Sequence, residues 1–194
     1  PKLSINNYQL SIESDWSSAS YFYSIIALSK IGTQITLSFY KKNSLQGDSI
    51  LVDIYKNFGV ETVFNEDKSI TISKVKIKNQ SQNFGKLIFN LQSSPDIAQT
   101  IAVTCFGLGI ECHLTGLCTL KIKETDRLLA LKNELQKLGA TVSITDDSFT
   151  LTKKVLPFGK SRNFGIGWTS ISTYQDHRMA MAFAPLALKT SLII

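Results

Sequence analysis

Hydrophobic and polar positions along this chain follow two different periods. Residues 31–39 alternate with the two-residue period of a strand, whereas residues 48–58 space their apolar side chains three and four positions apart, as an amphipathic helix does. Gly59 follows the second segment, where a helix C-cap is expected. The pattern predicts a β-α-β-α-β-β unit made of a strand at 8–13, a helix at 15–29, a strand at 31–39, a helix at 48–58 and strands at 61–64 and 69–73.

The same unit recurs about 80 residues later, as a search for internal repeats reveals. The run Ser-Ile-Thr-Ile-Ser-Lys at 69–74 matches Ser-Phe-Thr-Leu-Thr-Lys at 148–153. The boundaries that this implies are 1–78 for a first unit, 79–155 for a second and 156–194 for an incomplete third, all within one globular domain. The second copy is predicted at 86–91, 96–107, 110–114, 126–138, 141–144 and 148–152.

Two kinds of helix are expected in each unit. Segment 126–138 is amphipathic, and its pattern predicts Lys132, Glu134 and Lys137 on the side that faces water. It would therefore cover a sheet from outside. The other kind carries no charge and must be surrounded by protein; its segments are 16–28, 97–106 and 179–188.

The three uncharged helices are predicted to pack together in the centre of the fold. Each is preceded by an aspartate, namely Asp15, Asp96 or Asp176, and a carboxylate suits the free N–H groups of a helix start. If the units are related by rotation, the three positive helix ends converge on one face. Such a face is predicted to bind anions.

Composition agrees with a folded protein that binds anionic partners. The 194 residues are 43% hydrophobic and 19% charged, with a net charge of +6 that is spread along the chain. No apolar run reaches the roughly 18 residues of a membrane-spanning helix, so no membrane association is expected. The spacing of Cys105, Cys112 and Cys118 fits neither a zinc site nor a disulfide framework, which is typical of a cytoplasmic protein without a metal.

The densest group of charges is a stretch of five in seven residues that ends at Arg127. One interpretation is a solvated helix start capped by Thr125 or Asp126. The other is a site in which Lys123 and Arg127 hold anionic groups, while Glu124, which lies between them, donates or accepts a proton.

Two further helix starts carry candidate chemistry. Asp176, His177 and Arg178 open the third uncharged helix, and an arginine there needs a partner. Pro95 and Asp96 open the second, and helix capping alone is enough to explain them. Each motif by itself therefore allows both a structural and a functional interpretation.

Taken together, these motifs resemble the EPSP synthase family. Those that carry the resemblance, in order, are Glu-Ser-Asp-Trp-Ser-Ser-Ala-Ser-Tyr-Phe at 13–22, Asn-Ser-Leu-Gln-Gly-Asp at 43–48, Pro95-Asp96, Lys-Glu-Thr-Asp-Arg-Leu at 123–128 and Tyr-Gln-Asp-His-Arg-Met-Ala-Met at 174–181.

The resemblance implies an α/β (α+β) fold, the enolpyruvyl transferase-like inverse α/β barrel, in a two-domain enzyme. This chain would be most of one domain, would lack the N-terminal domain, and would be inactive alone. The implied reaction moves the enolpyruvyl group of phosphoenolpyruvate to the 5-hydroxyl of shikimate 3-phosphate, without a metal or organic cofactor. The resemblance assigns the hydroxyl proton to Asp96 and the methylene proton to Glu124. It implies that substrate is bound by Lys123, Arg127, His177 and Arg178.

Two alternatives remain, and the second belongs to a different class. A UDP-N-acetylglucosamine enolpyruvyl transferase shares the fold and the phosphoenolpyruvate chemistry, but its reactive-loop cysteine and its set of motifs are not found here. A basic nucleic-acid-binding module would account for the isoelectric point near 9.2. Against it, the charges do not cluster, and no strand carries the interleaved aromatic residues of an RNA-binding module.

Overall fold

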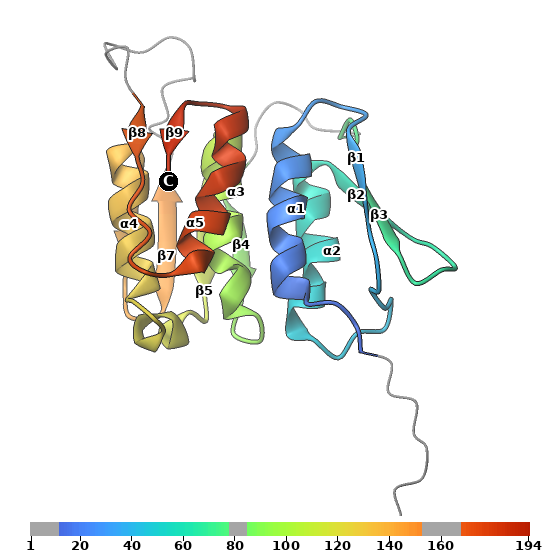
Figure 1. Ribbon diagram of the computed structural model, residues 1–194. Coiled ribbons are helices and arrows are strands. Elements are labelled where there is room, and N and C mark those ends of the chain that lie inside the picture. The colour runs from blue at the N-terminus through green and yellow to red at the C-terminus, as the bar shows by residue number, and fades with distance from the viewer. Residues whose placement is uncertain (1–11, 78–84, 153–167) are drawn as a thin grey trace, which may run out of the picture.

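The computed structural model describes residues 12–77, 85–152 and 168–194 (Figure 1). The first unit consists of helix α1 (Trp16–Leu28), strand β1 (Gln34–Leu37), the short helices η1 (Gly47–Ile50), α2 (Leu51–Ile54) and η2 (Tyr55–Phe58), and strands β2 (Val60–Phe64) and β3 (Ile70–Lys74). The second consists of β4 (Leu87–Asn90), η3 (Pro95–Ile97), α3 (Ala98–Leu108), β5 (Cys112–Thr115), η4 (Cys118–Ile122), α4 (Arg127–Lys137), β6 (Thr141–Ile144) and β7 (Ser148–Thr152). The third begins with β8 (Thr169–Ser170), α5 (His177–Phe183), η5 (Ala184–Leu188) and β9 (Leu192–Ile193).

The sheets repeat one topology. The first is antiparallel in the order β1-β3-β2, and the second has the order β4-β5-β7-β6, with β4 and β5 parallel. Strands β8 and β9 are parallel and flank α5, as β4 and β5 flank α3. The second unit thus confirms the predicted β-α-β-α-β-β order, and the described strands form three separate sheets without a closed barrel. The strand predicted at 8–13 lies largely outside the described residues.

Helices α1, α3 and α5 lie side by side in the interior, as predicted (Figure 1). Side chains 80 positions apart meet across this layer, and their hydrogen bonds are Ser20–Thr100 at 3.0 Å, Thr104–Ser24 at 2.8 Å and Gln99–Met179 at 2.9 Å. Residues at equivalent places in successive units therefore face one another. The repeat read from the sequence corresponds to a contact in space.

Local details depart from the predicted helices. The segment at 48–58 is three short helical pieces rather than one, although Gly59 does end it in the left-handed conformation, with φ at 70°. The helix expected at 179–188 changes to a 3-10 helix at Ala184, one residue before Pro185. A proline lacks the N–H that a continuing α-helix needs. None of the helices in the described part of the chain is both long and apolar enough to cross a membrane.

One prediction about α4 is wrong. Glu134 was expected on the side of the helix that faces water, but its side chain is fully buried, while Lys137 is exposed as predicted. Glu134 lies one helical turn after Leu131 on the packed face of α4, together with Leu135. Its carboxylate is tolerated there because it accepts hydrogen bonds from Lys137, Ser172 and Tyr174.

We expect the amides of α5 to exchange with solvent faster than those of α3. Ten of the eleven residues of α3 are buried, against three of the seven in α5. A helix with fewer buried contacts opens at a lower free-energy cost. Hydrogen exchange of the purified chain at low concentration measures both helices at once, and equal protection would contradict this expectation.

Candidate active site

The N-terminal ends of α1, α3 and α5 lie at the same end of the helix layer (Figure 1). Asp15 caps α1 by accepting from two backbone amides of the first turn at 3.1 and 3.0 Å, and Asp176 caps α5 by accepting from the backbone N–H of Arg178 at 2.8 Å. Asp96 differs, because it lies in η3 and no side chain caps that helix. Its carboxylate is directed to cationic side chains instead.

Arg127 connects these helix starts. It is the first residue of α4, and its side chain is 1% exposed. Its Nε donates to Asp176 Oδ2 at 2.7 Å, Nη1 to Asp96 Oδ1 at 3.0 Å and Nη2 to Glu124 Oε2 at 2.5 Å. Each of the three guanidinium nitrogens thus donates to a carboxylate. Asp126 caps α4 as one interpretation expected, but Arg127 is buried and not part of a solvated helix start.

Asp96 gathers three cations. Besides Arg127, its oxygens lie 3.4 Å from Lys123 Nζ and 3.8 Å from Arg178 Nη2. The two outer cations keep accessible surface, since the side chains of Lys123 and Arg178 are 34% and 21% exposed. Glu124 is more open still, at 51%. We call this group of Asp96, Lys123, Glu124, Arg127, Asp176 and Arg178 the charged cluster.

The charged cluster unites five of the six residues proposed from the sequence. His177, the sixth, lies beside Arg178 in the first turn of α5 with its side chain exposed. The predicted residues come from η3, from the segment before α4 and the first residue of α4, and from the start of α5. Residues distant in sequence therefore meet at one end of the helix layer.

Two members of this surface were missed by the sequence interpretation. Tyr21 is buried in α1, and burial raises the pKa of its hydroxyl while the charge of Arg178 and a hydrogen bond from it oppose the rise. Asp48 accepts a hydrogen bond from Ser17 Oγ. Burial raises the pKa of Asp48, the bond from Ser17 lowers it and the charge of Asp96 raises it further, for a net upward shift.

A sequence signal for Asp48 existed in the stretch 43–48. Gln46 accepts from the backbone N–H of Trp16 at 2.9 Å and so supports the start of α1. A Cβ on Gly47 would lie 2.1 Å from the carbonyl oxygen of Ser93, so only glycine permits this approach. The glycine therefore lets η1 pack against the loop that leads into η3 and Asp96.

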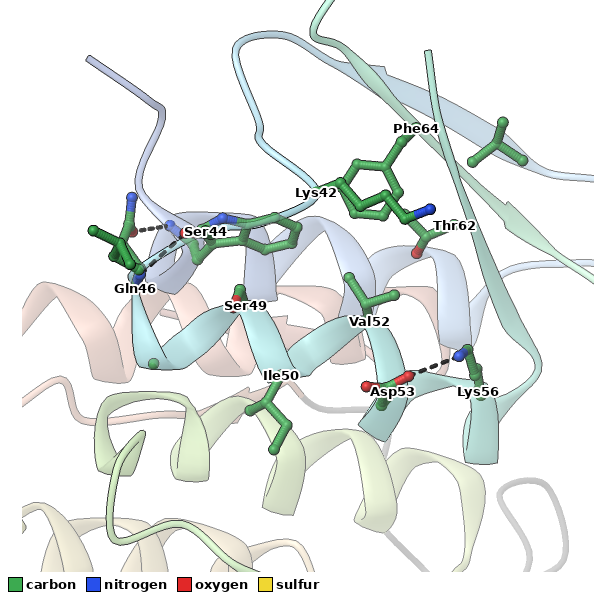
Figure 2. Close-up of a pocket in the computed structure, with 14 residues that line it drawn as sticks. Lys42, Ser44, Gln46, Ser49, Ile50, Val52, Asp53, Lys56, Thr62 and Phe64 are labelled. Carbon is green, nitrogen blue, oxygen red and sulfur yellow. Dashed lines mark hydrogen bonds and ion pairs between the residues drawn. The ribbon is translucent and has the colours of Figure 1, made fainter. Parts of the chain in front are cut away.

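A groove of about 870 Å³ lies elsewhere, between residues 42–46, α2 and β2 (Figure 2). None of the predicted site residues lines it. Its charged side chains, Lys42, Asp53 and Lys56, are exposed, and Asp53 and Lys56 form an ion pair at 2.7 Å. The charged cluster is the better candidate for chemistry, because it pairs buried charges of opposite sign beside partly exposed ones.

Cys105, Cys112 and His113 belong to other parts of the fold, and Cys118 is exposed at the start of η4. Cys105 and Cys112 are buried in α3 and β5, and burial raises the pKa of the Cys105 thiol well above its ordinary value. A ring nitrogen of His113 lies 2.8 Å from the Thr150 hydroxyl. Within the described ranges, no three His, Cys, Asp or Glu side chains are grouped so that they could hold a metal ion.

Comparison with known proteins identifies related enzymes. The chain is 40% identical over 177 residues to a 3-phosphoshikimate 1-carboxyvinyltransferase of Bacteroides fragilis (strain YCH46), which covers 91% of this chain and 40% of the relative. It is 32% identical over 180 residues to the enzyme of that name from Haemophilus influenzae, covering 93% of this chain and 38% of the relative. The chain therefore spans about 40% of the length of these curated relatives.

The fold is also that of solved structures. An EPSP synthase from Acinetobacter baumannii superposes with a TM-score of 0.65 at 23% identity, covering 93% of this chain and 40% of that one. The family model described as EPSP synthase (3-phosphoshikimate 1-carboxyvinyltransferase) matches residues 1–194. Because that match extends over the whole sequence, the chain belongs to the EPSP synthase family.

Proposed function

We propose that this chain supplies one side of an active site that transfers the enolpyruvyl group of phosphoenolpyruvate to the 5-hydroxyl of shikimate 3-phosphate. The other side would come from the N-terminal domain of the same protein. The observation that supports this most is the charged cluster, in which partly exposed cations and carboxylates share one surface. Two anionic substrates can meet only where fixed positive charge lowers their repulsion.

The two accessible carboxylates suit the two proton transfers of an addition and elimination. Asp96 would accept the proton of the 5-hydroxyl of shikimate 3-phosphate. The hydroxyl oxygen would at the same time attack the enol carbon of phosphoenolpyruvate. Glu124 would deliver a proton to the methylene carbon and later remove one, so that phosphate leaves and the double bond is restored. Both are held by Arg127, at 3.0 and 2.5 Å, which fixes their distance from each other.

The cations would divide the anion binding between them. Lys123 and Arg178 have exposed surface and loose contacts to Asp96, at 3.4 and 3.8 Å, so they can turn to a ligand. Arg127 is buried under three carboxylates and would reach a ligand only where Glu124 releases its Nη2. His177, whose side chain is exposed, would add a hydrogen-bond donor at the rim of the site.

Phosphate release from phosphoenolpyruvate and shikimate 3-phosphate tests the proposed reaction. Turnover is expected from the full-length protein that carries this chain, and none from the 194-residue chain alone, because closure of two domains supplies both proximity and exclusion of water. UDP-N-acetylglucosamine in place of shikimate 3-phosphate is the matched control and should give no product. A full-length protein that releases phosphate only with the control substrate would overturn the proposal.

Replacing Arg178 with alanine in the full-length protein should mainly weaken phosphoenolpyruvate binding. Arg178 is proposed to hold this substrate equally in the ground state and the transition state. Loss of one charge-assisted contact is worth about 1.5–3 kcal/mol, or roughly ten- to a hundredfold in KM. Steady-state kinetics measure the effect, and the exposed Lys56→Ala is the control. An unchanged KM would remove Arg178 from substrate binding.

A further inference from the structure

Helix α4 buries a carboxylate that takes no part in the proposed proton transfers. The Glu134 side chain is 0% exposed. Its Oε1 accepts from the Tyr174 hydroxyl at 2.7 Å, and its Oε2 accepts from the backbone N–H of Ser172 at 3.1 Å. Lys137 Nζ donates to both oxygens, at 2.8 and 2.7 Å. A buried carboxylate is costly unless it is fully hydrogen-bonded, so these contacts form one unit.

The segment that Glu134 holds is strained. Tyr174 and Gln175 both have positive φ, at 56° and 58°. Non-glycine residues adopt this left-handed region at an energetic cost, and they keep it only where the surroundings fix it. The carboxylate of Glu134 fixes one side of this turn through Ser172 and Tyr174, while partial burial and the bond to Glu134 raise the pKa of the Tyr174 hydroxyl.

The strained turn leads directly into the charged cluster. Asp176 follows Gln175, binds Arg127 at 2.7 Å and caps the backbone N–H of Arg178 at 2.8 Å. Arg127 and Glu134 lie seven residues apart on the buried face of α4, which is about 10 Å along the helix axis. Helix α4 therefore holds residues 172–176 at two points, one at each end of the turn.

We propose that Glu134 is a positioning residue that ties the turn at 172–176 to α4 and thereby sets Arg178 against Asp96. This inference rests on the proposed function, in which Arg178 binds phosphoenolpyruvate. Glu134 itself does not touch the substrate. It acts through the hydrogen bonds that the backbone N–H of Ser172 and the hydroxyl of Tyr174 donate to its carboxylate.

Glu134→Gln in the full-length protein tests the proposal. Glutamine keeps an acceptor at only one of the two carboxylate oxygen positions, so either the Ser172 N–H or the Tyr174 hydroxyl loses its acceptor. Lys137 loses the charged partner that it now binds through both oxygens, so the hold of α4 on the turn weakens. The KM for phosphoenolpyruvate should rise about tenfold, while the KM for shikimate 3-phosphate changes less than about twofold. Glu61→Gln makes the same exchange at an exposed position of β2 and should change neither KM.

Tyr174→Phe removes the hydrogen bonds of the hydroxyl to Glu134 and Asn133 and keeps the Glu134 carboxylate paired with Lys137, so it serves even where Glu134→Gln fails to fold. Its KM for phosphoenolpyruvate should rise about threefold. Hydrogen exchange of peptides covering 172–178 should quicken in both variants, more in Glu134→Gln. A purely structural role predicts a lower Tm with an unchanged KM, and that result would overturn the proposal.

The two proposals fail in different ways. If the unsubstituted full-length protein releases no phosphate from its two substrates, the proposed function fails, and hydrogen exchange alone then decides the role of Glu134. Exchange at 172–178 that is unchanged in Glu134→Gln would show that the turn needs no anchor from α4. Faster exchange there, together with turnover and a raised KM, supports both.

Discussion

Glu124→Gln in the full-length protein is expected to lower kcat by about 10²–10⁴-fold, the usual contribution of a positioned proton-transfer group. Glutamine keeps the shape of the side chain and can still accept from Arg127 Nη2, which now lies 2.5 Å from the carboxylate. It cannot give and take a proton at the methylene carbon. Binding of shikimate 3-phosphate should be largely retained, so steady-state kinetics should show a loss in kcat.

The structural interpretation of Glu124 makes the opposite forecast. If the residue only supports the start of α4, its replacement costs about 1 kcal/mol of stability and leaves the kinetics alone. A melting curve recorded beside the kinetics separates the two, with the exposed Glu66→Gln as the matched control. A Glu124→Gln enzyme with unchanged kcat would remove Glu124 from the chemistry.

Arg127→Met should destabilise the chain by about 3–5 kcal/mol, the range measured when one partner of a buried ion pair is removed. Methionine nearly fills the volume but leaves Asp176, whose side chain is 0% exposed, without its cation. Asp96 and Glu124 lose a shared partner in the same step. Urea unfolding of the purified chain measures the change in the free energy of unfolding.

An exposed ion pair supplies the control for Arg127. Lys56 and Asp53 are 61% and 73% exposed at 2.7 Å, so Lys56→Met should cost no more than about 1 kcal/mol. The comparison removes the same formal charge from a buried and an exposed pair. An Arg127→Met chain that loses as little as the control would mean that the carboxylates around Arg127 are stabilised by other groups.

The repeat and its helices were predictable from the sequence because their signals are local. An uncharged segment such as 97–106 can be stable only inside protein, whatever its neighbours are, and α3 is indeed buried along its length. The 80-residue offset between matching strands and aspartates likewise predicted units whose central helices pack together. Ser20 and Thr100, which are 80 residues apart and occupy equivalent places in the two units, form a hydrogen bond with each other.

The charged cluster was predictable only as a set of candidates. Capping accounts for Asp15 and Asp176, but only the tertiary structure turns Asp96 away from a cap and toward Arg127, 31 residues later in the chain. Asp48 and Tyr21 were not assigned to the site, although both lie in stretches that carried the family resemblance, because nothing in those stretches indicates that the charge of Arg178 acts on them. Pairing between distant charges depends on how the units are placed against each other.

Glu134 shows most clearly where a local pattern fails. By itself, the sequence determined that 126–138 is an amphipathic helix, because apolar side chains recur at its period. It assigned Glu134 to water, since a carboxylate is normally solvated. Lys137 lies one turn further on in the same helix, but only the tertiary structure supplies the donors of Ser172 and Tyr174, which lie 38 and 40 residues further on. Burial of a charge is decided by its partners, and those partners are brought together by the fold.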